Sequence, residues 1–588
     1  MATFGLDFGT TFSTVSVVTS SGYLFFQQND SAYIPTSLFF FPSGGVCFGY
    51  QADKNFISKA DGSYFRDLKR YVGCTSRTIG NYLTKLRPHY RVTPVKVGYG
   101  VSDTVSLSAY NEAGADTFDL PFLIATYVSR LIETAEEAFR CKCSSLIVSV
   151  PAGYSCSKRL FMEACVSLSG YQCRAMLNEP SAAAIAALPH LSPTDSLLLV
   201  YDFGGGTFDV SLATVVGSTI AIKDSSGDMN LGGRDIDRAL SDWIKSRAGV
   251  ITPEPLDVSA LKEALSISSE TLTYTLDVAG NPQVRISPSD LAEIARPFID
   301  RSIAVVLKLL KSSKFRSLKP KVVLVGGSSA LPGLSQLITQ MPSFSGVVEV
   351  PDARGAVSAG CALFVRSFDA TSDMHLVDCV TVSVSVCSLR GMAVCIVPKG
   401  SPLPFVGSKS ITLENLTRSA PIIFKFFEGE STRVVYNDPL FAFEFYLKDW
   451  GLDAWSISSL KVTIHTEVSS VGEVSLRLSA ANSSLDMKPS KLYDFPTPSK
   501  PIPHIVNDNR EKLDSIKNFI ALASNPQARN NNKALLSDTS VLSSTPSHVF
   551  IDTAAAGPSE FDAAELVLRQ TVPRNVRSST VRRVPFGG

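Results

Sequence analysis

One short pattern occurs twice in this sequence, about two hundred residues apart, and it limits the folds that the chain can adopt. The two copies are Phe4-Gly-Leu-Asp-Phe-Gly-Thr-Thr-Phe12 and Val200-Tyr-Asp-Phe-Gly-Gly-Gly-Thr-Phe208. Each copy joins an apolar strand to an aspartate, then to a turn of small residues and a second apolar segment. Such a repeat predicts two similar halves that face each other.

The two turns predict a phosphate site. Glycine lets the backbone turn tightly and approach a ligand, so the turn amides can point at phosphate oxygens. We expect these amides to come from Gly9, Thr10, Thr11, Gly204, Gly205 and Gly206. Asp7 and Asp202 end the strands beside the turns, where a carboxylate would reach Mg2+ directly or through its waters. The pattern therefore predicts metal-assisted phosphoryl transfer.

A third glycine pair strengthens this interpretation. Either turn alone is more typical of an ordinary hairpin than of a phosphate site. Gly326-Gly327-Ser328, however, follows a third apolar segment at Lys321 to Val325, and the three turns together favour a nucleotide site. No strand is followed by G-x-G-x-x-G or G-x-x-x-x-G-K-[ST], so the sequence predicts neither a Rossmann nor a Walker site.

The chain divides into three regions by pattern. Up to about residue 368, strand-like and helix-like segments alternate, which indicates an α/β fold; residues 120–139 show helical spacing of apolar side chains. From about Val377 to Ser484, short β-branched runs such as 380–386 and 460–464 predict an antiparallel sandwich. After Pro489 we expect one helix at 509–523 within a largely disordered stretch.

Composition excludes several classes of function. A net charge of +1 gives no overall electrostatic reason for nucleic acid or a membrane surface to be the main partner. The 11 Cys include no CxxC pair, which favours reduced thiols in a cytosolic setting, and the 6 His are isolated and predict no metal cluster. No apolar run approaches the roughly 18 residues of a membrane-spanning helix, so we expect no membrane insertion.

The three turns resemble the two phosphate motifs and the adenosine motif of the superfamily of actin, sugar kinases and heat-shock proteins. Four further segments are similar to DnaK-type seventy-kilodalton heat-shock chaperones: Asn178-Glu-Pro-Ser-Ala-Ala-Ala-Ile-Ala186, Val150-Pro-Ala152, Asp228-Met-Asn-Leu-Gly-Gly233 and Asp67-Leu-Lys-Arg70. The resemblance is dense through residue 368 and weaker from 376 to 430. It implies an actin-like ATPase domain of two lobes with a duplicated ribonuclease-H-like fold at 1–368, a linker at 369–379, a peptide-binding-like β-sandwich at 380–487, and a helical and disordered tail at 488–588.

The resemblance also implies roles for individual residues, with ATP or ADP and Mg2+ as cofactors. Lys69 would stabilise charge near the γ-phosphate, although a solvated surface lysine is the alternative. Asp7, Glu179 and Asp202 would hold the metal, mostly through water, although Glu179 could instead cap the following helix. Thr207 and Asp209 would line the hydrolytic pocket, although Asp209 could merely end a turn. The nucleoside and its phosphates would lie against Gly232, Gly233, Lys262, Ser266, Gly326, Gly327, Ser328 and Asp352.

Two departures from the family affect the predicted adenine pocket. Glu263 and Ala330 stand where the family carries the two cations that sandwich the base, and Ser259 replaces an acidic residue that contacts the nucleoside. Loss of one stacked guanidinium forfeits about 1 to 2 kcal/mol, roughly tenfold or more in affinity. We therefore expect weak adenine binding and a weak ATPase.

The second half of the chain predicts binding rather than chemistry. An exposed strand edge with apolar pockets can capture extended peptide segments through main-chain hydrogen bonds. After Ser484 we expect no long charged helical lid, and the end Val584 to Gly588 differs from the acidic tail of cellular chaperones. The last stretch carries Arg569, Arg574, Arg577, Arg582 and Arg583, which fit either a solvated tail or an RNA or virion contact.

The phosphate cleft, the divergent sandwich, the missing lid and the segment 30–36 together resemble the chaperone homologues of plant closteroviruses. That resemblance implies virion tail assembly and cell-to-cell movement, with viral coat proteins and a companion virion-tail protein as partners. It places the chain in the host cytoplasm, the virion and plasmodesmata. A general cellular chaperone, a virion subunit that does not hydrolyse nucleotide, and a sugar kinase remain as alternatives; a sugar kinase would not account for the sandwich.

Overall fold

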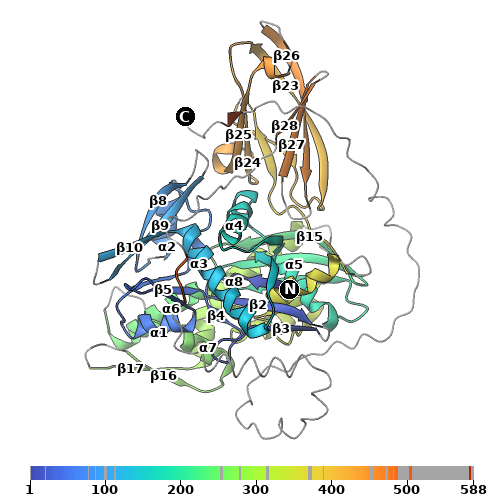
Figure 1. Cartoon of the computed structure of the whole chain (residues 1–588). Helices are drawn as coiled ribbons and strands as arrows, with labels where there is room; N and C mark the ends of the chain where they lie inside the picture. The colour runs from blue at the N-terminus through green and yellow to red at the C-terminus, as the bar shows by residue number, and fades with distance from the viewer. Residues whose placement is uncertain are drawn as a thin grey trace.

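A computed structural model shows an α/β region with a β-rich region at one end (Figure 1). It describes residues 2–19, 22–76, 78–86, 88–97, 102–111, 114–251, 256–276, 278, 280–312, 315, 317–368, 374–388, 390–450, 452, 456–469, 474–480, 483–487, 502–505 and 582–583. Several expectations lie outside these residues: the first part, 369–373, of the linker predicted at 369–379, the helix at 509–523, the end at 584–588, and Arg569, Arg574 and Arg577.

Two sheets with matching topology form the α/β region. The first has the order β12 (Cys173–Asn178), β11 (Cys143–Val150), β1 (Ala2–Asp7), β2 (Phe12–Thr19) and β3 (Gly22–Phe25), with β4 (Ile34–Pro35) paired to β2. The second has the order β19 (Gly346–Val348), β18 (Lys321–Val325), β13 (Leu197–Phe203), β14 (Phe208–Val216), β15 (Thr219–Asp228) and β20 (His375–Val377). In both sheets the first three strands run parallel and the next two pair antiparallel. We call residues 2–190 the first half and 197–368 the second half.

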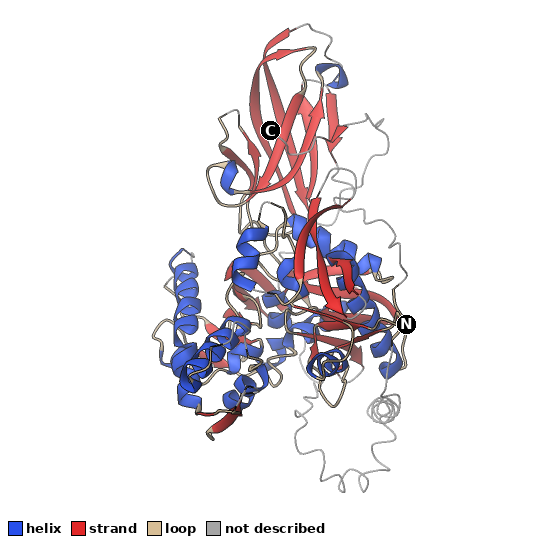
Figure 2. Ribbon diagram, turned by 90° about the vertical axis from the view of Figure 1, so that its left-hand side faces the viewer, coloured by secondary structure: helices blue, strands red, loops and turns tan. Residues whose placement is uncertain are grey.

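The helices pack around these sheets, while the β-rich region is almost free of helix (Figure 2). The first half contains α1 (Tyr50–Ile57), α2 (Ile79–Leu86), α3 (Leu120–Phe139), α4 (Cys156–Leu168), α5 (Glu179–Ala187) and the 3-10 turns η1 (Leu68–Tyr71) and η2 (Leu188–His190). The second half contains α6 (Gly233–Ala248), α7 (Ser259–Ile267), α8 (Pro288–Ser312), α9 (Leu334–Gln340), α10 (Ala356–Leu363), η3 (Gly327–Ala330) and η4 (Phe364–Phe368).

Smaller sheets extend both halves. In the first half, β5 (Ser37–Phe40) lies between β6 (Val46–Phe48) and β7 (Ser63–Arg66), and β9 (Ser102–Asn111) lies between β8 (Arg91–Val97) and β10 (Gly114–Asp119). In the second half, β16 (Leu272–Thr275) pairs with β17 (Gln283–Ile286). Among the described helices, none combines the length and the apolar character that crossing a bilayer requires.

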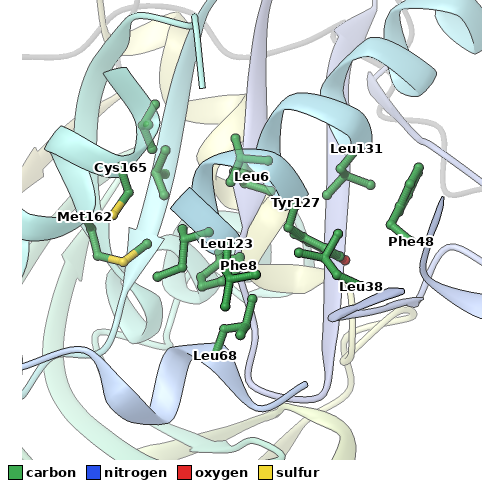
Figure 3. Close-up of a cluster of buried hydrophobic side chains, with 14 of the residues drawn as sticks. Leu6, Phe8, Leu38, Phe48, Leu68, Leu123, Tyr127, Leu131, Met162 and Cys165 are labelled. Carbon is green, nitrogen blue, oxygen red and sulfur yellow. The ribbon is translucent and has the colours of Figure 1, made fainter. Parts of the chain in front are cut away.

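The core of the first half lies between its sheet and α3. Leu6 of β1 and Leu123, Tyr127 and Leu131 of α3 are fully buried in one cluster (Figure 3). The helical spacing predicted for residues 120–139 is confirmed, because α3 covers the same residues. Burial extends beyond the predicted apolar face and includes Thr126, since the helix is covered on more than one side.

Two helices rich in small residues join the halves. The buried cluster that contains α5 and α10 also contains Ile147 of the first sheet and Val200 of the second. Alanines on α5 let backbones approach closely, so both sheets pack against the same helix pair. A displacement of α5 would therefore change its packing against the sheets of both halves.

The β-rich region is antiparallel. One sheet has the order β22 (Ala393–Val397), β21 (Val384–Cys387), β24 (Ile422–Glu428), β25 (Asp438–Phe445) and β29 (Arg582–Arg583), and the other β23 (Phe405–Thr417), β26 (Ser456–Val468), β27 (Val474–Ala480) and β28 (Ser483–Met487). Side chains of both sheets share one apolar cluster, and η5 (Val434–Tyr436) and η6 (Leu447–Trp450) lie in connections. The strand predicted from residue 380 starts only at 384, and the run 460–464 is part of the longer β26.

Two contacts bring late parts of the chain onto earlier elements. Val46 N donates to His504 O at 3.0 Å, and Ile502 and Ile505 pack against the core of the first half. The tail was expected to be largely disordered and to have one helix, so this strand-like contact was missed. The backbone of the two-residue strand β29 lies antiparallel to the end of β25, with Arg582 opposite Glu444 in the strand register; for Arg582 the sequence had left a solvated tail or an RNA contact open.

Candidate functional site

The two glycine turns touch each other. A β-carbon at Gly205 would lie 2.3 Å from Thr11 Oγ1, and one at Gly206 would lie 2.4 Å from Thr10 Oγ1. Real β-carbons do not approach other atoms so closely, so these contacts require glycine. The predicted approach of the turns is thus confirmed: the glycine backbone of the second turn lies against the threonine side chains of the first.

Four acidic residues surround these turns. Asp7 ends β1, Glu179 begins α5, and Asp202 of β13 pairs across the strands with Asp209 of β14. Glu179, Asp202 and Asp209 are each less than 7% exposed. Pairing within two sheets of equal topology therefore brings carboxylates from three strands and one helix start to the same place.

Burial dominates the protonation of these acids. It raises the pKa of Glu179 to about 7, although the Lys69 ammonium acts in the opposite direction. Burial likewise raises the pKa of Asp209 to about 6, with Lys69 again lowering it, and it raises the pKa of both Asp202 and Asp7. A cluster of this charge would be stabilised in its ionised form by a divalent cation.

Lys69 lies inside this cluster. Its Nζ is 2.5 Å from Glu179 Oε1, and the residue is 6% exposed. Burial alone would lower the pKa of Lys69, but the carboxylates of Glu179 and Asp7 outweigh it and hold that pKa above its usual value. The alternative of a solvated surface lysine is therefore wrong. The Glu179 side chain pairs with Lys69, and the α5 start has no side-chain cap.

The donor set fits a metal held through water. Asp7 Oδ1 accepts from Ser149 Oγ at 2.7 Å. Neither oxygen of Asp209 has a hydrogen-bond partner of good geometry, although the Gly153 backbone, the Thr207 side chain and the Ala152 backbone are near enough to lower its pKa. No three acidic, His or Cys side chains within the described ranges converge as direct metal ligands. The carboxylates suit the outer shell of a hydrated ion such as Mg2+.

The remaining predicted residues of the second half gather beside the second turn. Gly204 N donates to Thr207 O at 3.0 Å, which closes this turn, and Gly204 O accepts from both Gly233 N at 3.0 Å and Ser328 Oγ at 2.9 Å. A β-carbon at Gly232 would lie 2.6 Å from the Gly206 backbone. The start of α6 and the glycine pair before η3 are thus tied to the turn at 204–206.

Lys262 and Ser266 lie near this group but are already engaged. Lys262 Nζ donates to Gly233 O at 3.1 Å and is 2.7 Å from Asp237 Oδ1. Ser266 Oγ donates to the Lys262 carbonyl at 2.8 Å, within α7. Asp352 contacts the first half directly, since its Oδ1 accepts from Tyr33 OH at 2.5 Å.

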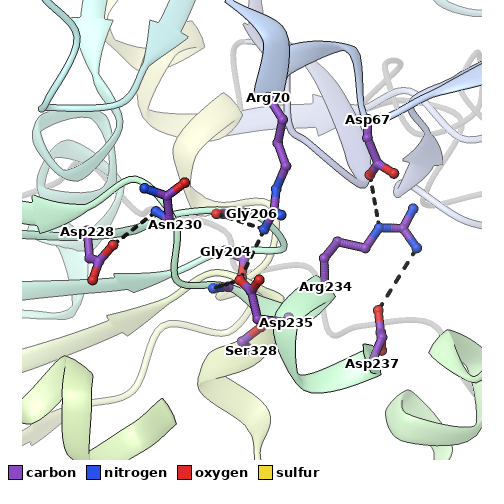
Figure 4. A network of polar contacts seen from close by, with 12 residues as sticks. Asp67, Arg70, Gly204, Gly206, Asp228, Asn230, Arg234, Asp235, Asp237 and Ser328 are labelled. Carbon is purple, nitrogen blue, oxygen red and sulfur yellow. Dashed lines mark hydrogen bonds and ion pairs between the residues drawn. The ribbon is translucent and has the colours of Figure 1, made fainter. Parts of the chain in front are cut away.

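Ion pairs between the halves flank the turns (Figure 4). Arg234 of α6 pairs with Asp67 at 3.1 Å, and Arg70 of η1 pairs with Asp235 at 3.1 Å and donates to Gly206 O at 3.2 Å. Burial alone would raise the pKa of Asp67, but Arg234 and neighbouring arginines lower it below its usual value. Sequence reasoning quoted Asp67 and Arg70 only as a motif and missed Arg234, although it directly follows Gly233.

A second arginine was also missed. Arg354 Nη1 is 3.3 Å from Glu263 Oε2, and its guanidinium lies over the Tyr33 ring, 4.1 Å from the ring centroid. Ala330 is exposed at the end of η3. As the sequence indicated, neither Glu263 nor Ala330 supplies a cation. The signal in the sequence was an arginine two residues after Asp352.

The cleft is linked to the β-rich region through residues next to Glu179. Asp378 Oδ2 accepts from Asn178 Nδ2 at 3.0 Å and from Ser181 Oγ at 2.9 Å, and β20 just before it pairs with β15. On α4, Cys156 N donates at 2.7 Å to Glu428 of β24, whose pKa burial raises to about 7. The residues on both sides of Glu179 therefore hold the segment that leads into the sandwich.

Comparison with known proteins agrees with this architecture. A family model described as "Hsp70 protein" matches residues 3–512. A protein of Beet yellows virus (isolate Ukraine) named "Movement protein Hsp70h" is 40% identical over 488 residues, 81% of this chain and 81% of the relative. A protein of the same name from Grapevine leafroll-associated virus 3 is 32% identical over 445 residues, 74% of this chain and 79% of the relative. A "Chaperone protein HscA homolog" of Methylibium petroleiphilum is 27% identical over 502 residues, 83% and 78% of the two chains.

Proposed function

The chain belongs to the Hsp70 family, and from that premise we propose that it binds MgATP between its facing turns and hydrolyses it to control the β-rich region. The observation that carries this proposal is the contact of Gly205 and Gly206 with Thr11 and Thr10. Family membership implies ATPase activity and an actin-like domain followed by a sandwich. The matching strand orders of the two sheets support a duplicated ribonuclease-H-like fold with two lobes. We propose that the ATPase domain covers residues 1–368, the linker 369–379, the β-sandwich 380–487 and the C-terminal tail 488–588.

In this proposal the phosphates are held by backbone amides from both halves. The turns at 9–11 and 204–206 approach the triphosphate from opposite sides, and Gly232, Gly233 and the 326–328 segment line the nucleoside end. Asp7, Glu179 and Asp202 would hold Mg2+ mostly through water; the ion would neutralise charge on the phosphate oxygens. Their mutual repulsion and raised pKa values support a site that is completed by a cation.

The hydrolytic step needs a positioned water and a positive charge. Asp209 is placed to accept a hydrogen bond from the attacking water, because its buried oxygens have no well-aligned protein partner. Thr207 lies on the same turn. The Lys69 ammonium would stabilise the charge that grows on the γ-phosphate in the transition state. Lys69 must then exchange part of its contact with Glu179 for the phosphate, which would couple phosphate binding to α5.

That coupling supplies a route to the β-rich region. Asn178 and Ser181 flank Glu179 and hold Asp378, so a shift of α5 would act on the segment that leads into the sandwich. We propose that the sandwich binds extended peptide segments, and that nucleotide state changes its docking on α4 through Glu428.

We propose further that the chain serves a plant virus. The Beet yellows virus relative is named a movement protein, and by that relationship we infer a role in cell-to-cell movement through plasmodesmata and in assembly of the virion tail. The inferred partners are viral coat proteins and a companion virion-tail protein, in the host cytoplasm, the virion and plasmodesmata. Contact of the arginine-rich tail with RNA is part of this proposal.

Two observations favour a second candidate, a virion subunit that keeps the fold without hydrolysis. Lys69 is already paired with Glu179, and neither Glu263 nor Ala330 provides the family's adenine cations. Steady-state ATP hydrolysis by the wild type, Lys69→Ala and Asp202→Ala separates the two. The enzyme hypothesis expects both variants to lose turnover. Equal, negligible rates in all three proteins, with no effect of nucleotide on protease cleavage near residues 369–379, would establish the structural subunit instead.

A general cellular chaperone would instead refold unrelated clients with helper-stimulated turnover.

A further inference from the structure

Arg354 lies beside Glu263, one of the two positions at which this chain lacks the cations of the family's adenine site. It lies in the connection between β19 and α10, and its side chain reaches two elements that carry predicted nucleoside residues. A β-carbon at Gly327 of η3 would lie 3.5 Å from Arg354 Nε, and Glu263 of α7 lies 3.3 Å from Arg354 Nη1. The guanidinium therefore sits between η3 and α7.

The neighbouring cation is not available for this role. Lys262 Nζ is held by the Gly233 carbonyl and by Asp237, and its residue is 9% exposed. The side chains of Arg354 and Glu263 remain 29% and 38% exposed, so both can meet a ligand that enters the cleft. Arg354 is thus a guanidinium that a nucleoside can reach.

The guanidinium is also presented in the geometry that suits an aromatic ring. It lies 4.1 Å from the centroid of the Tyr33 ring and 5.0 Å from that of Phe12, within the range of a cation–π interaction, which extends to about 6 Å. The Tyr33 ring is anchored because its hydroxyl donates to Asp352 at 2.5 Å. The planar cation thus contacts two aromatic rings and is paired through Nη1 with Glu263.

We propose that Arg354 is the residue that contacts the nucleobase in this chain, and that Glu263 is a positioning residue that holds its guanidinium between η3 and α7. A nucleobase offers a π-face to a guanidinium, as Tyr33 does, whereas a bare polyphosphate has none. The exchange of a cation for glutamate at position 263 is then not a loss, because it supplies the carboxylate that orients the relocated arginine. This inference rests on the proposed binding of MgATP.

A ligand with a nucleobase and a bare polyphosphate together distinguish contact with the base from contact with the phosphates. Calorimetric titrations of the full chain with MgATP and with magnesium tripolyphosphate would be run on the wild type, Arg354→Ala and Arg296→Ala. Arg296 pairs with Asp300 at 2.7 Å on α8 and serves as the control for loss of an exposed, paired arginine. We expect Arg354→Ala to weaken MgATP binding about tenfold, the loss typical of one stacked cation, and to leave tripolyphosphate binding unchanged. Arg296→Ala should match the wild type for both ligands.

Glu263 is tested by rescue. Glu263→Ala should weaken MgATP binding severalfold and leave tripolyphosphate binding unchanged, and Glu263→Asp should recover most of the loss. Equal weakening of both ligands by Arg354→Ala would overturn the inference, because it would show that Arg354 acts on closure of the cleft. Unchanged MgATP binding by Arg354→Ala would overturn it as well. Absence of MgATP binding in the wild type would instead remove the proposed function on which it rests.

Discussion

The carboxylate of Asp378 accepts a hydrogen bond of 2.9 Å from the hydroxyl of Ser181, two residues after Glu179 in the cleft. The same carboxylate oxygen accepts from Asn178, on the other side of Glu179. Asp378 is 8% exposed, and its main chain leads directly from β20 toward the sandwich. One buried side chain thus connects the helix that begins in the cleft to the segment that precedes the β-rich region.

Replacement of Asp378 by Ala should release this segment. The change leaves the Ser181 hydroxyl and the Asn178 amide buried without their acceptor, at a cost of about 1 to 3 kcal/mol for each such group. We expect faster hydrogen exchange and faster protease cleavage over residues 374–383, with MgATP affinity close to that of the wild type. Asp242→Ala, at an exposed position of α6, is the matched control. Unchanged exchange in Asp378→Ala would show that this contact does not hold the segment.

Lys69 and Glu179 should depend on each other. Lys69→Ala leaves the Glu179 carboxylate buried without its cation, which typically destabilises a protein by about 3 to 5 kcal/mol. The double variant Lys69→Ala/Glu179→Ala should recover part of that stability and still lack turnover. Urea unfolding combined with ATP hydrolysis measures both effects, and Lys223→Ala, an exposed lysine on β15, is the control. A stability change equal to that of Lys223→Ala would contradict burial of this pair.

The nucleotide-free protein should lose stability as the pH rises. Burial raises the folded-state pKa of Glu179 and Glu428 to about 7 and that of Asp209 to about 6, from ordinary values near 4. Between those limits the folded state binds more protons than the unfolded state, so the stabilisation is complete below about pH 4 and is lost as the pH rises through 6 to 7. The melting temperature should therefore fall between pH 5 and pH 7.5.

The Glu428→Gln variant isolates the contribution of the contact between α4 and the sandwich. Its amide cannot ionise, so the fall in melting temperature should be smaller than in the wild type. Glu430→Gln, two residues along the chain, is the control for loss of a carboxylate at this end of β24. Added MgATP should reduce the fall in melting temperature with pH that remains in Glu428→Gln, because a divalent cation stabilises the ionised carboxylates around Glu179. A melting temperature that rises from pH 5 to pH 7.5 would refute this assignment of raised pKa values.

The late segment 502–505 should protect one amide of β6. Val46 N donates to His504 O at 3.0 Å, and Ile505 packs against the core of the first half. Ile505→Asp would place a charge against that core, so the exchange of the Val46 amide should become faster. Ile251→Asp changes a fully exposed isoleucine and is the control. Equal exchange of Val46 in both variants would mean that this segment does not cover β6.

The local sequence pattern was sufficient to predict the parts of the candidate site that depend on backbone geometry, namely the glycine turns. Glycine at 205 and 206 is required by close approach, and a turn after an aspartate was recognisable from spacing alone. The environment of Lys69 was not recognisable, because its burial depends on Glu179, which lies 110 residues further along the chain. Arg354 was missed for the same reason. Its partners on α7 and at Tyr33 are remote in sequence, and only the fold brings them together.

The β-rich region and the tail were predicted less completely. Short β-branched runs indicated an antiparallel sandwich, but strand ends depend on pairing between distant segments, as for β23 with β26. The contact of 502–505 with β6 carries no local signal beyond two isoleucines flanking a proline and a histidine. Such edge contacts are specified by the partner strand and not by the segment itself.

The touching turns at 9–11 and 204–206 should close around a triphosphate and its metal. Calorimetric titration with MgATP tests it directly when the wild type is compared with Gly206→Ala, whose added β-carbon would lie 2.4 Å from Thr10 Oγ1. Gly80→Ala, where a β-carbon meets no atom within 4 Å, is the control. We predict saturable binding heat for the wild type and Gly80→Ala, and none for Gly206→Ala at unchanged secondary structure. No heat with the wild type at millimolar MgATP, or equal binding by Gly206→Ala, would contradict the account.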